Sequence, residues 1–232
     1  MAMTFRDFLI QEHIYREAVQ KYNHNHDERG RFATTSRAGG QHKPHMKGQE
    51  LVEYTMKELG ISQQEAKDMI REISGYTDGY ATDMRTWQQG GSRFDMQEMT
   101  PSEAKRMSDQ VERYIDLAPK WGDGDIYRGV GVDDVTAGRI LDEIYSDKPI
   151  SMMGTSSWTS DRSIAEDFSE LPSADIAIIF HAPGTQKGTS IDHISDFSQS
   201  EVLVSKEARW KVKQFEGGID DGYMIVDLEE LP

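Results

Sequence analysis

The residue pattern of the chain changes once, near residue 121, and this change most limits what it can fold into. Before it, apolar residues recur three and four positions apart, behind two helix-capping patterns, SQQE at 62–65 and TPSE at 100–103. After it, one helix is expected at 160–170, with Ser160 as its N-cap. Segments rich in β-branched and aromatic residues predict strands at 126–130, 150–158, 175–182, 201–205, 209–216 and 223–230. Helices followed by strands predict an α+β domain.

The first 48 residues differ from the rest of the chain. Residues 4–20 have a loose helical spacing of apolar residues, whereas residues 22–48 have almost no aliphatic side chains. This second stretch carries five Lys and Arg residues against two acidic ones, although the whole chain has a formal net charge of −15. We therefore expect an N-terminal helix and a flexible basic arm over 1–48, and one folded domain over 49–232.

Composition argues against several classes of function. The net charge of −15 opposes general affinity for nucleic acid and for anionic lipid. The chain has no cysteine, which excludes disulfides and thiolate chemistry. It has no apolar run of about 18 residues, so nothing is expected to span a membrane. Its first residues lack the pattern of a signal peptide, and we expect a soluble protein.

Three of the expected strands carry polar residues where core residues would be usual. An arginine within a strand is costly unless it meets a carboxylate or a phosphate. Residues two apart on a strand point to the same side. A structural Arg–Glu pair would explain one of these positions but not all three. The positions are Arg128 beside Gly129, the pair Ser157 and Thr159, and the pair Gln199 and Glu201.

In this order, the polar positions resemble the Arg–Ser–Glu class of mono-ADP-ribosyltransferases. The segment SGYTDGY at 74–80 looks like that family's helix entry, and residues 190–212 look like its end-of-domain signature. The resemblance covers residues 50–230 in the right order. It implies the ADP-ribosyltransferase fold, with two packed antiparallel β-sheets, preceding helices and one inserted helix. Residues 49–232 would then be the catalytic domain.

The resemblance also implies that NAD is a substrate, and it gives the polar residues their roles. Glu201 would stabilise the oxocarbenium-like ribose that forms when nicotinamide leaves. Arg128 would hold the NAD phosphates, because its planar fork suits that anion. Gly129 would offer its backbone to the nicotinamide carboxamide. Ser157 would orient Glu201, with Thr159 beside it in the NAD site.

The resemblance implies different roles for two arginines, Arg162 and Arg85. Arg162 lies in the segment that wraps the phosphate and nicotinamide in the family, so it would add a contact to NAD. The alternative is that Arg162 is a surface residue in the first turn of a helix. Where the family often has an Asn-x-x-Leu-Arg helix, this chain has DMRTWQQ. A role for Arg85 in binding NAD is therefore not expected.

The resemblance places the acceptor at the residue two before the catalytic glutamate. In the family, Glu there goes with arginine targets, whereas Gln goes with asparagine, glutamine or threonine in proteins, or with guanine. Gln199 therefore predicts a non-arginine acceptor, since a carboxamide pairs with an amide or a base edge. Phe197 lies in the same turn and is expected to help dock the target. The acidic charge disfavours nucleic acid, so a host protein is the expected target.

The remaining sequence signals concern the origin of the protein and alternative functions. The string HDERGRFA at 26–33 resembles segments of phage head-associated proteins. It suggests a bacteriophage product that acts in the host cytoplasm, carried in the virion or bound to head proteins through the arm. A virion-associated protein that keeps the fold without catalysis is one alternative, and an NAD glycohydrolase is another. Histidines in the arm have H-x-H and H-x-x-H spacing, but no metal is expected, because metal sites need more ligands on a rigid frame.

Overall fold

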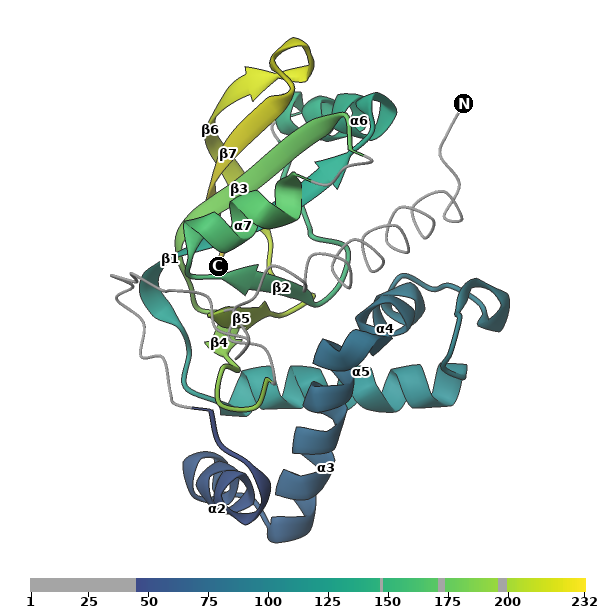
Figure 1. Cartoon of the computed structure of the whole chain (residues 1–232), viewed down its shortest axis with the longest axis vertical. Coiled ribbons are helices and arrows are strands. Elements are labelled where there is room, and N and C mark those ends of the chain that lie inside the picture. The colour runs from purple at the N-terminus through teal and green to yellow at the C-terminus, as the bar shows by residue number, and fades with distance from the viewer. Residues whose placement is uncertain (1–44, 147, 171–173, 196–199) are drawn as a thin grey trace, which may run out of the picture.

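The computed structural model describes residues 45–146, 148–170, 174–195 and 200–232 (Figure 1). Almost all of the expected N-terminal helix and arm, over 1–48, lies outside the described residues. The two residues assigned to the acceptor, Phe197 and Gln199, also lie outside them.

A group of helices comes first in the described part of the chain, and Figure 1 shows it beside β4 and β5 at one end of the sheet. Both expected capping boxes are confirmed, because Ser62 and Thr100 each accept a backbone N–H three residues on, from Glu65 and Glu103. The helical segments are α2 (Gly48–Leu59), α3 (Gln63–Gly75), the π-helical η2 (Tyr76–Tyr80), α4 (Ala81–Gln88), the 3-10 segment η3 (Arg93–Asp95) and α5 (Pro101–Leu117). We call this group the helical layer.

The strands form one mixed sheet in the order β4-β5-β2-β1-β3-β7-β6. Among the strands of the described residues, only β3 and β7 pair in parallel, and the other neighbours are antiparallel. The 3-10 segment η4 (Ile219–Asp221) lies between the last two strands. The strands are β1 (Gly122–Val132), β2 (Ser156–Thr159), β3 (Ile176–Thr185), β4 (Gly188–Ser190), β5 (Glu201–Val204), β6 (Trp210–Gly218) and β7 (Tyr223–Glu230).

The α+β class is confirmed, but the expected division into two antiparallel sheets is wrong in detail. The halves β4-β5-β2 and β1-β3-β7-β6 are continuous, because Tyr127 of β1 pairs with Thr159 of β2. The sheet nevertheless curls back on itself, since Trp158 of β2 packs against Trp210 of β6 with ring centroids 5.2 Å apart. The two expected layers are therefore two halves of one strongly twisted sheet.

Two helices, not one, are inserted between strands. The expected one is α7 (Arg162–Ser169), although Asp161 and not Ser160 is its N-cap, accepting from the Ser163 N–H at 3.0 Å. The unexpected one is α6 (Asp134–Tyr145), between β1 and β2. Its apolar residues Ala137, Ile140, Leu141 and Ile144 lie three or four positions apart and pack on the first core described below. Its N-cap is Asp133, which accepts the Thr136 N–H at 2.7 Å, so the sequence carried a helix signal that was overlooked.

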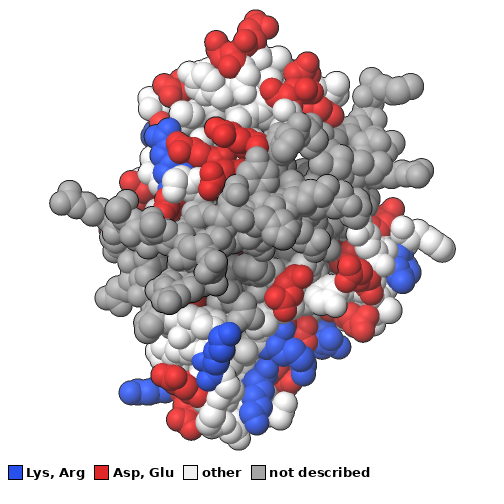
Figure 2. Space-filling view, in the orientation of Figure 1, with Lys and Arg blue, Asp and Glu red and all other residues white. Residues whose placement is uncertain are grey.

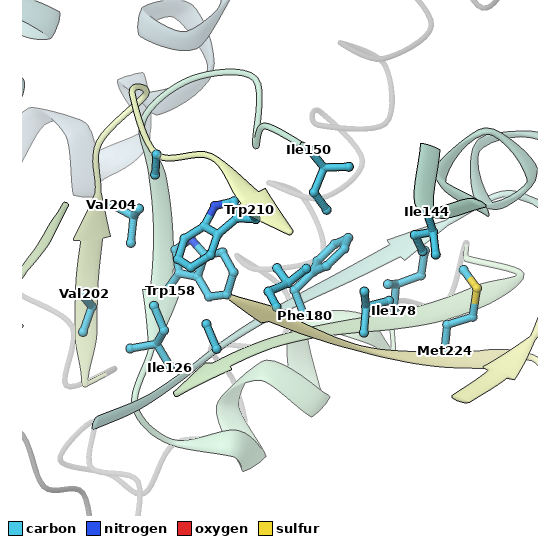
Figure 3. Close-up of a cluster of buried hydrophobic side chains, with 14 of the residues drawn as sticks. Ile126, Ile144, Ile150, Trp158, Ile178, Phe180, Val202, Val204, Trp210 and Met224 are labelled. Carbon is cyan, nitrogen blue, oxygen red and sulfur yellow. The ribbon is translucent and has the colours of Figure 1, made fainter. Parts of the chain in front are cut away.

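Two hydrophobic cores lie on the two sides of the sheet. Figure 3 shows the first, between the sheet halves, where Trp158 and Trp210 meet beside Val202 and Val204. The second joins the helical layer to the sheet, and several methionines are buried in it. Its members include Met69, Ile73, Met84, Met107, Ile115, Ile191 and Leu203.

Helix α7 lies directly on β1, and a glycine allows this. A Cβ at Gly129 would stand 1.7 Å from the backbone oxygen of Ala165, so no other residue fits without moving the helix. The close approach at Gly129 is therefore made by protein backbone.

Charge is unevenly spread over the described surface. On the face in Figure 2, acidic side chains gather at the end that carries β6, β7 and α6, whereas most Lys and Arg side chains lie over the helical layer. None of the described helices is long and apolar enough to cross a membrane.

Candidate active site

The site is built on the pairing of two short strands, β2 and β5. Thr159 pairs with Glu201, and Ser157 pairs with Leu203. Paired residues in an antiparallel ladder have their side chains on one face, so Ser157, Thr159 and Glu201 share a face. The Glu201 carboxyl accepts hydrogen bonds from the hydroxyls of Ser157 and Ser195. The structure thus brings together two residues that lie 44 positions apart in the chain.

Glu201 is a buried carboxyl group with an unusual proton affinity. Its side chain is shielded, with the residue only 6% exposed. Burial raises the pKa of Glu201 to about 7, and the nearby Asp192 carboxylate adds to the rise, while the Ser157 and Ser195 hydroxyls oppose it. Asp192 also fixes the backbone, because its Oδ1 accepts the Glu201 N–H at 2.6 Å. A carboxyl group tuned to neutral pH inside a protein is typical of catalytic sites.

The backbone just before Glu201 is strained. Ser200 has φ of 50°, in the left-handed region that side chains other than glycine rarely adopt. Its carbonyl oxygen accepts the Ser160 N–H at 3.0 Å, which ties this bend to the end of β2. Strain of this kind persists where surrounding contacts enforce it, and it is common at functional sites.

Arg128 lies beside the same pair of strands. Its Nη1 donates to the backbone oxygen of Ser157 at 2.8 Å, and its side chain is half-buried. The guanidinium is therefore held at β2, next to the hydroxyl that contacts Glu201. The expected neighbourhood of Arg128, Ser157 and Glu201 is present, while their roles stay predictions.

Sequence reasoning missed Tyr76, which comes from the helical layer. Its hydroxyl lies 3.0 Å from Ser157 Oγ. Burial raises the pKa of Tyr76, the Arg85 guanidinium opposes the rise, and Glu201 adds to it. Arg85, which was not expected to bind NAD, is thus an electrostatic neighbour of Tyr76 and is itself only 8% exposed. The signal in the sequence was the segment SGYTDGY, which contains the π-helix η2, and such turns are frequent at functional sites.

Two other candidates are placed less directly. Gly129 pairs with Ile179 of β3 in the ladder and lies under α7, so its contact with nicotinamide stays a prediction. Arg162 begins α7, is 55% exposed and pairs with Glu166 at 2.8 Å. It also lines a groove of about 340 Å³ on the outer side of β1, β3 and β7, together with Tyr127 and His181. These contacts fit the surface alternative, and a contact with NAD stays a prediction.

Within the residues that the structure describes, no group of three or more His, Asp or Glu side chains has the arrangement of a metal site.

No protein-family model matches the chain, and no curated protein matches it by sequence. Solved structures do match its fold. The Vis toxin, an ADP-ribosyltransferase from Vibrio splendidus, aligns with a TM-score of 0.57 and 15% identity over 82% of this chain and 88% of that one. The C3 exoenzyme of Clostridium limosum aligns with a TM-score of 0.54 and 13% identity over 83% and 98%. The ADP-ribosylating toxin BECa of C. perfringens, solved with NADH, aligns with a TM-score of 0.55 and 15% identity over 79% and 46%.

These matches extend over most of the described residues and include both the helical layer and the sheet. At such identities they bear on architecture alone. With its seven-stranded mixed sheet and preceding helices, the chain has the fold of the ADP-ribosyltransferases.

Proposed function

We propose that the protein is an NAD-dependent mono-ADP-ribosyltransferase that modifies a host protein at a residue other than arginine. The observation that carries the proposal is the hydrogen bond from Ser157 to the buried Glu201 carboxyl, with Arg128 held at the same strand. A fold shared with ADP-ribosyltransferases, one of them solved with NADH, supports NAD as the substrate.

The proposed reaction breaks the bond between ribose C1′ and nicotinamide nitrogen. The electron pair leaves with nicotinamide, which is cationic in NAD and departs neutral, while positive charge develops on the ribose. Ionised Glu201 stabilises that charge, and the acceptor then attacks C1′ and loses a proton. Arg128 binds the phosphates, and Arg85 beside Tyr76 supplies a second guanidinium. Thr159, Gly129 and Arg162 complete the proposed NAD contacts.

On the acceptor side, Gln199 and Phe197 are proposed to contact the target. A carboxamide two residues before the catalytic carboxylate favours an amide or hydroxyl acceptor over guanidinium. Action in a host cytoplasm, and carriage in a phage virion through the basic arm, are proposed from the HDERGRFA string at 26–33.

The test is transfer of label from NAD in a bacterial lysate. Purified protein, labelled NAD and lysate are incubated, and the product is treated with protease or nuclease. Label released by protease and dependent on Glu201 supports the proposal. Glu201→Gln should abolish incorporation and leave the Kd for NAD within about threefold, because the carboxylate acts on transition-state charge.

The matched control is Glu229→Gln, an exposed glutamate on β7 paired with Lys213 at 2.8 Å. It should turn over like the wild type. Label that persists in Glu201→Gln contradicts the assignment of Glu201. Label sensitive only to nuclease contradicts the protein target, release of nicotinamide without incorporation indicates an NAD glycohydrolase, and no turnover at all indicates the non-catalytic alternative.

The rates of nicotinamide release and of label incorporation show whether Gln199 contacts the acceptor or NAD. Gln199→Ala should keep nicotinamide release by water but lower incorporation about 5- to 150-fold, the effect of losing one amide contact. Gln199→Glu should begin to label arginine. A parallel fall of both rates in Gln199→Ala would place the residue in the NAD site or in the fold.

A further inference from the structure

A single carboxylate joins the helical layer to the far ends of both site strands. Glu112, on α5, accepts a hydrogen bond from the Thr155 hydroxyl through Oε1. The same oxygen accepts the Lys206 N–H at 3.1 Å, and Oε2 accepts the Ser205 hydroxyl at 2.6 Å. Thr155 immediately precedes β2, and Ser205 immediately follows β5. Glu112 therefore holds together the two ends that face away from Glu201.

A second side chain, Gln88 on α4, forms hydrogen bonds with the same threonine, Thr155. Its Nε2 donates to Thr155 Oγ1 at 2.8 Å and to Ser108 Oγ at 2.9 Å, and its Oε1 accepts the Thr155 N–H at 2.9 Å. The preceding Gly154 has φ of 134°, and a Cβ there would stand 2.8 Å from Gln88 Oε1 and 3.1 Å from Arg85 Cγ. The loop before β2 is thus docked closely on α4.

These contacts connect two halves of the site that the sheet alone does not connect. The ladder between β2 and β5 aligns Ser157 with Glu201, but it does not set how the strands sit on the helices. The helices carry Tyr76, which contacts Ser157, and Arg85. Apolar packing is non-directional, whereas hydrogen bonds between fixed partners allow little sliding.

We propose that Glu112 and Gln88 are positioning residues for the ADP-ribosyl transfer reaction. They hold the Ser157–Glu201 strand pair in alignment with Tyr76 and Arg85 from the other end of the same strands. Neither residue touches NAD in this proposal. The effect on turnover rests on the proposed function, whereas the effect on strand alignment does not.

The first test compares two carboxylates of the helical layer, the partly buried Glu112 and the buried Glu72. Glu112→Ala removes the contacts to both strands. Glu72→Ala is the control, because Glu72 is 2% exposed and pairs with Arg106 and Arg71 within the helical layer, each at 3.0 Å. Below the unfolding temperature of both variants, Glu112→Ala should lower kcat about 10- to 100-fold with KM for NAD changed less than about threefold. Glu72→Ala should lower the melting temperature but leave kcat within about twofold.

A conservative variant sharpens this comparison. Glu112→Gln keeps an oxygen for Thr155 and Lys206, and the Ser205 hydroxyl can rotate to accept from the new amide. It should restore kcat to within about threefold of the wild type. Gln88→Ala should repeat the kcat effect, and it replaces Glu112→Ala if that variant does not fold.

Hydrogen exchange tests the alignment without any turnover. In Glu112→Ala, the amides of 155–159 and 201–206 should exchange at least about tenfold faster than in Glu72→Ala under equal stability conditions. If the wild type does not turn over NAD, the proposed function fails, and exchange alone decides whether the two strands are held by Glu112. Equal exchange in the two variants, or equal kcat in an active enzyme, would reduce Glu112 to a stability contact and overturn the inference.

Discussion

The hydroxyl of Tyr76, on the helical layer, lies 3.0 Å from the Ser157 hydroxyl on β2, across 81 positions of sequence. Ser157 also hydrogen-bonds the Glu201 carboxyl. An ionised carboxylate only accepts, so Ser157 donates to Glu201 and is left to accept from Tyr76. Ser157 therefore connects the helical layer to the buried Glu201 carboxylate through two hydrogen bonds.

The first prediction concerns the effect of Ser157 on the pH dependence of kcat/KM for NAD. The Ser157 hydrogen bond lowers the pKa of Glu201, against the rise caused by burial. Ser157→Ala should therefore raise the pKa of Glu201 further, and the acid limb of the kcat/KM profile for NAD should move to higher pH. At pH 6 the rate should fall about tenfold or more, the effect of losing a hydrogen bond to a charged group. The profile is measured from nicotinamide release, and Ser157→Thr should restore most of the rate. An acid limb that stays in place or moves to lower pH would contradict this role for Ser157.

A second prediction concerns stability. The pKa of Glu201 is raised from 4.5 to about 7 in the folded protein, so the folded state binds this proton more tightly than the unfolded state. The buried carboxyl therefore destabilises the fold as pH rises from 4.5 through 7. Glu201→Gln cannot ionise, and at pH 8 it should be more stable than the wild type by about 3 kcal/mol. This gain should be absent below pH 4.5, the unfolded value.

Urea unfolding at pH 8 and pH 4 measures this difference. The matched control is Glu229→Gln, because Lys213 holds the pKa of the exposed Glu229 carboxyl below its usual value. Its substitution should give no gain at pH 8. A Glu201→Gln variant that is less stable than the wild type at pH 8 would show that the carboxylate is better solvated than its burial indicates.

The third prediction concerns the contact between β1 and α7. Gly129→Ala would place a Cβ 1.7 Å from the Ala165 oxygen, so α7 has to move and the free energy of unfolding should fall by about 3 kcal/mol. Gly138→Ala on α6 is the control, because a Cβ there meets nothing within 4 Å. That substitution should raise stability by about 0.5–1 kcal/mol, the helix propensity of Ala over Gly. Equal effects at the two glycines in urea unfolding would refute the close approach.

A fourth prediction concerns the loop that leads into α5. The buried Asp83 carboxylate accepts the backbone N–H groups of Gln97, Glu98 and Met99 at 2.9, 2.7 and 2.7 Å. Asp83→Asn replaces one acceptor by a donor and leaves at least one N–H unpaired, so it should cost about 1–3 kcal/mol. Asp109→Asn, in an exposed pair with Lys105, should change stability by less than about 0.5 kcal/mol in the same thermal unfolding experiment. A larger loss at Asp109 than at Asp83 would be the contrary result.

Local features of the molecule were readable from the sequence. The capping boxes that begin α3 and α5 involve residues three apart, so the pattern and the hydrogen bond coincide. Period-two alternation placed Ser157 with Thr159 on one side of a strand, as the ladder bears out. Of the elements that were missed, α6 has a readable signal, an Asp133 N-cap followed by apolar residues at helical spacing, whereas β4 is too short to give one.

The amino-acid sequence by itself determined most of the helices and strands, and which polar residues stand where core residues are usual. Only the tertiary structure decided that Thr159 lies opposite Glu201, that Tyr76 reaches Ser157, and that one curled sheet replaces two. The physical reason is the sequence distance over which each kind of interaction acts. Caps and periodicity depend on neighbours within one turn or one strand, whereas strand order and register depend on packing summed over residues distant in sequence.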